Sequence, residues 1–76
     1  MVDHTSDQVA MDREIAQLQR NISRIRREIR LQGAEMQALI GADLDCTDAA
    51  RRLMRMQADL VLFIEKRERL KAPEAA

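Results

Sequence analysis

Apolar side chains recur in steps of four and three residues through the first half of the chain. This repeat is typical of an α-helix that packs lengthwise against another helix. It predicts one long helix over residues 6–40, and Thr5 and Gln8 have the Thr-x-x-Gln spacing of a capping box at its N-terminus. Gln32 and Gly33 interrupt the repeat, and the glycine indicates a hinge, a close helix crossing or a tolerated local weakness. The repeat consists of Met11, Ile15, Leu18, Ile22, Ile25, Ile29, Met36 and Leu39.

A second repeat with the same spacing occupies the second half of the chain. Helix-forming residues dominate this half, and Pro73 then blocks continuation because proline has no backbone N–H. The pattern predicts a second helix over residues 47–71. The repeat consists of Cys46, Ala49, Leu53, Met56, Leu60, Phe63, Arg67 and Leu70.

Turn and capping residues separate the two repeats over residues 41–46. Gly41 has no Cβ and suits a position with φ above zero at the end of a helix. Asp45 and Thr47 can each accept a hydrogen bond from the free N–H groups that open the next helix. A connection this short folds the second helix back along the first. The predicted fold is therefore all-α, an antiparallel two-helix hairpin of the coiled-coil kind.

The two repeats complement each other in an antiparallel register of small crossing angle. Arg67 is the one charged member, and we expect its stem to pack on Leu18 while its guanidinium reaches water or an acid. The predicted layers are Leu39/Cys46, Met36/Ala49, Gln32/Leu53, Ile29/Met56, Ile25/Leu60, Ile22/Phe63, Leu18/Arg67 and Ile15/Leu70.

The chain is long enough for one domain only. We expect the hairpin to occupy residues 6–71, between an N-terminal tail (1–5) and a C-terminal tail (72–76). No basic region followed by an apolar run opens the chain, and no apolar run approaches the roughly 20 residues of a membrane helix. We therefore expect a cytoplasmic protein that contacts no membrane.

The second helix carries more apolar surface than the first can cover. Met54, Val61 and Ile64 form a second stripe beside its main repeat. Left exposed, this stripe would be a large apolar patch, and a second copy giving a four-helix bundle would cover it. We expect a homodimer, or another protein as partner, to contact Met11, Met54, Leu60, Val61, Phe63 and Ile64.

Arginine supplies 11 of the 13 basic residues, and residues 20–30 hold five arginines against one glutamate. Such a belt can contact phosphates. Against that interpretation, the net charge is zero, Phe63 is the only aromatic residue, and the charged outer face of a coiled coil is usually just solvated. Candidate nucleic-acid contacts are Arg20, Arg24, Arg27, Arg30, Arg51 and Arg55.

Residues with catalytic or metal-binding chemistry are few. His4 is the single histidine and lies in the predicted tail, and Cys46 has no histidine nearby that would make it a nucleophile. The carboxylates of Asp43, Asp45 and Asp48 lack the remaining ligands of a calcium loop, and capping explains them better. We therefore expect no enzyme, no cofactor and no metal. The first hypothesis is a homo-oligomeric structural or protein-interaction module, and the alternative is an RNA- or DNA-associated dimer.

One set of capping and repeat positions spans residues 22–70. It consists of Ile29, Gln32, Met36, Leu39, Ile40, Gly41, Asp43, Thr47, Ala50, Leu53, Met56, Leu60, Arg67 and Leu70. This pattern resembles that of small bacterial helical-hairpin proteins. The resemblance implies a hairpin fold and implies no activity, cofactor or site residue.

Overall fold

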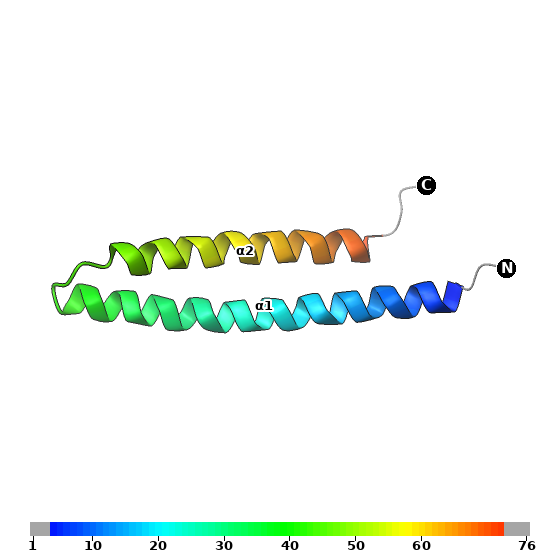
Figure 1. Ribbon diagram of the computed structural model, residues 1–76, viewed down its shortest axis with the longest axis horizontal. Coiled ribbons are helices and arrows are strands. Elements are labelled where there is room, and N and C mark those ends of the chain that lie inside the picture. The colour runs from blue at the N-terminus through cyan, green and yellow to red at the C-terminus, as the bar shows by residue number, and fades with distance from the viewer. Residues whose placement is uncertain (1–3, 73–76) are drawn as a thin grey trace.

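Two antiparallel helices make up the part of the chain that the computed structural model describes, residues 4–72 (Figure 1). Helix α1 spans His4–Gly41 and α2 spans Thr47–Lys71, with no strand among the described residues. The start of α1 and the end of α2 lie at the same end of the molecule (Figure 1). The predicted all-α hairpin is confirmed. Neither helix has a stretch long and apolar enough to cross a membrane.

The ends of the helices agree with the prediction at three of four places to within one residue. α1 begins two residues before its predicted start and ends one residue later, at Gly41, whereas α2 has its predicted bounds. The predicted capping box is not formed as proposed, because Thr5 lies inside α1 and Gln8 donates from Nε2 to Asp12 Oδ1 at 3.0 Å. The Thr5 side chain lies outside the described residues, as do residues 1–3 and 73–76 of the two predicted tails.

The core is a single seam between the helices. All members of the predicted layers are buried or half-buried. Full burial is reached at the centre of α1 and near the start of α2, where Leu18, Ile22, Ile25 and Ala49 are at most 5% exposed. Gln32 is also buried, and its amide donates from Nε2 to Glu35 Oε2 at 2.8 Å. The polar break in the repeat therefore stays in the seam because its amide has a partner.

One contact beside the seam agrees with the predicted register. Glu35 and Arg52 lie between consecutive layers, and their side chains approach to 3.9 Å between Oε1 and Nη2. Arg67 is mostly covered, with 22% of its side chain exposed, and its Nε donates to Oε1 of Glu68 at 3.0 Å. The guanidinium thus reaches an acid, as expected, and that acid lies on its own helix.

The helix-ending residue differs from the prediction. Gly41 is the last residue of α1 and its φ is not positive, while Asp43 takes the left-handed conformation with φ 58°. The Asp43 N–H donates to Ile40 O at 3.0 Å, and the Leu44 N–H donates to Leu39 O at 2.8 Å. This bond pair is the Schellman motif, which leaves the left-handed position one residue after the cap. The helix therefore includes Gly41, and the left-handed conformation falls two residues later, on Asp43.

Separate substitutions of Gly41 and Asp43 test which of the two residues is left-handed in the turn. Gly41→Ala is expected to stabilise the protein by about 0.5–1 kcal/mol, since glycine weakens a helix and an added Cβ would meet nothing within 4 Å. Asp43→Gly is expected to stabilise it by about 1 kcal/mol, because the left-handed conformation strains residues with a Cβ. Thermal and urea unfolding measure the free energy of unfolding of both variants. A lower free energy of unfolding in Gly41→Ala would contradict this assignment and would indicate that Gly41 is the left-handed residue.

Gly33 makes no close crossing between the two helices of this hairpin. α1 runs through it without interruption, and an added Cβ would meet nothing within 4 Å. The tolerated local weakness, one of the three interpretations of this glycine, agrees with the structure.

Candidate interaction surface

The turn carboxylates act on the backbone. Asp45 Oδ1 accepts the Thr47 N–H at 2.9 Å and the Thr47 hydroxyl at 2.6 Å. The first of these bonds confirms the predicted capping by Asp45, which satisfies a free N–H at the start of α2. The expectation for Thr47 is wrong, because its hydroxyl donates to Asp45. Cys46 occupies the N-cap position itself, and its side chain makes no capping hydrogen bond.

Hydrogen bonds from Thr47, first from its hydroxyl and then from its N–H, lower the pKa of Asp45. A carboxylate with a lowered pKa stabilises the fold above its unfolded pKa of about 3.9, and this contribution is lost as the pH falls through the folded pKa. Asp45→Asn is therefore expected to lower the melting temperature at pH 7, by an amount that shrinks below about pH 4. Asp59→Asn, which removes an exposed carboxylate of α2, is the control. If the difference in melting temperature between Asp45→Asn and the wild type stayed constant from pH 7 to pH 2, it would contradict this role of Asp45.

The other residues with reactive chemistry are Cys46, Asp48 and His4. Cys46 is a free, half-buried thiol, and Asp48 lies in the first turn of α2, where the helix dipole favours a carboxylate. The His4 side chain lies outside the described residues. Within residues 4–72 no three His, Cys, Asp or Glu side chains are grouped as metal ligands.

The seam has two edges of different character. Along one, which we call the ionic edge, carboxylates of α1 face cations of α2. Its two cross-helix contacts are Glu35–Arg52 at 3.9 Å and Glu14–Lys66 at 3.7 Å. All four side chains are about half exposed, so each pair adds less than about 1 kcal/mol. The ionic edge therefore fixes register more than it adds stability.

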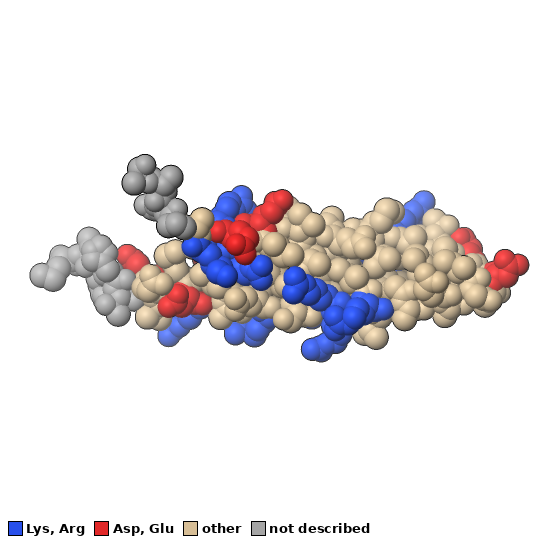
Figure 2. Space-filling view, turned by 180° about the vertical axis from the view of Figure 1, so that it is seen from behind, with Lys and Arg blue, Asp and Glu red and all other residues tan. Residues whose placement is uncertain are grey.

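The opposite edge, which we call the apolar edge, is lined by Gly33, Ala50 and Ile64, all half-buried. Beside it on α2 lie Met54 and Val61, which are 61% and 53% exposed. No ion pair between α1 and α2 is formed along this edge in the described part of the chain. Figure 2 shows a face on which a broad area free of charged side chains extends over both helices on the turn side.

The predicted interface residues fall into two groups. Leu60 and Phe63 are seam residues, half-buried between the helices, and Ile64 is half-buried at the edge of the seam. Met54 and Val61 are exposed beside the seam, and Met11 is 40% exposed on α1. The structure thus brings Met54, Val61 and Ile64 together on one face of α2.

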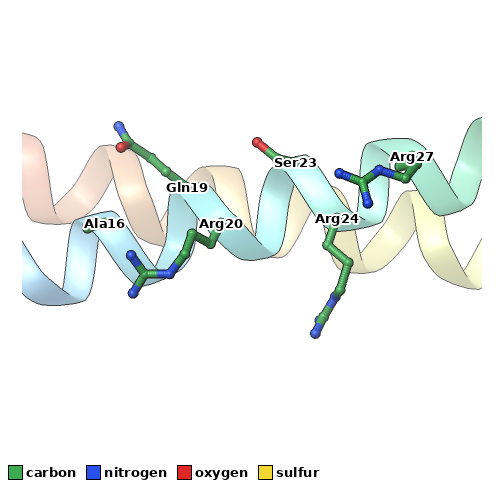
Figure 3. A pocket seen from close by; sticks show the side chains of 6 residues that line it. All are labelled: Ala16, Gln19, Arg20, Ser23, Arg24 and Arg27. Carbon is green, nitrogen blue, oxygen red and sulfur yellow. The ribbon is translucent and has the colours of Figure 1, made fainter.

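All six candidate nucleic-acid contacts are exposed. Among carboxylates of residues 4–72, Glu28 is the one that pairs with any of the six, at 3.8 Å from Arg24, and both side chains are about half exposed. Arg20 donates to Gln17 Oε1 at 2.7 Å. The structure adds a feature that the repeat does not indicate, a shallow hollow of about 450 Å³ on the outer side of α1. Its lining residues are Ala16, Gln19, Arg20, Ser23, Arg24 and Arg27 (Figure 3).

Short side chains create this hollow. Ala16 and Ser23 leave a low area on the helix surface, and arginines with long side chains border it. Figure 3 shows Arg24 extended away from the helix and the Arg27 guanidinium turned along it. The alternation of small residues and arginine on one helix face is visible in the sequence and could have indicated the hollow.

Comparison of this chain with known protein families, with curated proteins and with solved structures finds no match.

Proposed function

We propose that this chain is a non-enzymatic interaction module whose apolar edge binds the same edge of a second copy, giving a four-helix bundle. The observation that supports the proposal most is the exposure of Met54 and Val61 beside half-buried Ile64 on a face without cross-helix ion pairs. An edge of this kind suits a two-fold contact, in which the same patch is used by both copies.

The surface area favours a second copy. The hairpin exposes 6144 Å², whereas a compact monomer of 8.8 kDa exposes about 4,800 Å². Its radius of gyration is 17.9 Å, against about 11 Å for a compact domain of this length. A standard interface buries about 800 Å² on each partner, which is less than this excess. The excess of exposed surface therefore supports a second copy as the partner.

The charges favour the apolar edge over the ionic edge as the contact. On the ionic edge, a second copy would have to desolvate Glu14, Glu35, Arg52 and Lys66, which are each about half exposed. On the apolar edge, Met54, Val61 and Ile64 present methyl, methylene and thioether groups, whose removal from water is favourable at about 25 cal/mol per Å². A helical hairpin is also the natural partner, since it can continue the packing of half-buried Leu60 and Phe63.

Light scattering and thermal melting test this proposal together. We expect a dimeric mass at micromolar concentration and a melting temperature that rises with protein concentration, because association is coupled to folding. A monomeric mass with concentration-independent melting would overturn the dimer. The apolar edge would then be a docking face for a different protein.

A further inference from the structure

Three arginines follow one another along the outer side of α1, at the border of the hollow. Arg20, Arg24 and Arg27 are all exposed and all line it, and we call them the arginine row. Their spacing of four and three residues corresponds to steps of about 6 Å and 4.5 Å along the helix axis. The row is thus about 10 Å long, a length over which one strand of B-DNA carries about three phosphates.

The cations of the row are free to bind an anion. Within the described residues, Arg20 and Arg27 have no carboxylate within 4.0 Å, and Arg24 has only the 3.8 Å contact with Glu28. That contact is about half exposed and worth little, so a phosphate can displace it. Gln19 and Ser23 add polar side chains to the lining of the hollow, and Figure 3 shows them on the side of the helix away from the Arg20 and Arg24 guanidinium groups.

We propose that the arginine row binds the phosphate backbone of a double-stranded nucleic acid without reading its sequence. Arginine suits this ligand because its planar guanidinium donates two parallel hydrogen bonds to a phosphate. A duplex fits better than a single strand, since single-strand binding relies on stacking of bases on aromatic side chains. The only aromatic residue, Phe63, is half-buried in the seam.

Other anionic surfaces fit the row less well. A membrane-binding helix inserts its apolar face between lipids, and the apolar face of α1 is packed against α2, with Leu18, Ile22 and Ile25 buried. The acidic turn of a second copy is a second source of carboxylates, with Asp43, Asp45 and Asp48 close together in the sequence. Asp45 already accepts two hydrogen bonds from Thr47, which makes it a weaker competitor for arginine than a phosphate.

Titration of the full chain with a labelled duplex of arbitrary sequence, at several salt concentrations, tests the row. The variant Arg20→Gln/Arg27→Gln removes two of its cations. The matched control, Arg69→Gln/Lys71→Gln, removes two exposed cations from the last turn of α2, which do not line the hollow. We expect the slope of log K against log salt to fall in magnitude by about 1.8 in the first variant, at about 0.9 per lost phosphate contact, and to stay unchanged in the second.

Several outcomes would overturn the proposal. One is the absence of duplex binding at 50 mM salt and tens of micromolar protein. Another is an equal loss in both variants, which would indicate a diffuse charge effect. A third is binding to vesicles containing phosphatidylserine in place of the duplex. The fourth is a change in oligomeric mass in Arg20→Gln/Arg27→Gln with duplex binding intact, which would assign the row to contact between copies. The proposal does not depend on the dimer, because each copy carries a complete row.

Discussion

Ile25→Asp is expected to abolish folding. Ile25 is 5% exposed and lies at the centre of the seam, so the variant buries a carboxylate that has no partner there. Burying an unpaired charge costs several kcal/mol. At about 0.05–0.15 kcal/mol per residue, a chain of this length has only about 4–11 kcal/mol of stability in total. Leu60→Asp, in the same predicted layer, is expected to act in the same direction with a smaller effect, because Leu60 is only half-buried.

Leu31→Asp provides the matched control for this variant. It introduces the same side chain into the same helix, at a position that is 66% exposed. We expect it to change the free energy of unfolding by less than about 0.5 kcal/mol, as surface substitutions usually do. Circular dichroism at 222 nm and thermal melting compare the two. Wild-type helicity and melting temperature in Ile25→Asp would show that the seam lies elsewhere.

Met54→Glu/Val61→Glu is expected to convert the proposed dimer into a monomer. Two charges placed on each apolar edge would face each other across the two-fold contact and would lose their hydration there. In an isolated hairpin these positions are more than half exposed, so the same substitutions would be almost neutral. A lower stability of this variant would therefore indicate that the wild-type hairpin associates through the apolar edge. We expect a lower melting temperature, independent of protein concentration, and a halved mass by light scattering.

The control for this variant is Leu31→Glu/Leu62→Glu. It replaces two apolar residues that are 66% and 62% exposed and adds the same charge, away from the apolar edge. The dimer should retain its mass in the control. Dissociation of both variants to the same extent would place the contact on a different face, and an unchanged mass in Met54→Glu/Val61→Glu would refute the apolar edge as the interface.

Helix positions and seam residues could be predicted because their signal is local and repeated. A step of three or four residues puts side chains on one face of a helix whatever lies opposite, and many repeats outweigh the single break at Gln32. The way in which α1 ends could not be predicted in the same way. Gly41 has the intrinsic preference for a left-handed conformation, yet Asp43 adopts it, because the Schellman hydrogen bonds form where the chain turns toward α2.

The candidate surface depends still more on the tertiary structure. The sequence indicated an apolar excess on the second helix and an arginine belt on the first, since both follow from composition along one helix face. Which side of the seam each residue occupies follows from how α2 lies against α1. That arrangement brings Glu35 to Arg52 and Glu14 to Lys66 on one edge, and leaves Met54 and Val61 beside an edge without ion pairs. By itself the sequence therefore determined the helices, their shared seam and the arginine-rich face, all of which repeat within one helix. Only the tertiary structure decided the difference between the two edges, because it depends on contacts between segments distant in the chain, and only the path of the backbone through the turn decided which residue is left-handed.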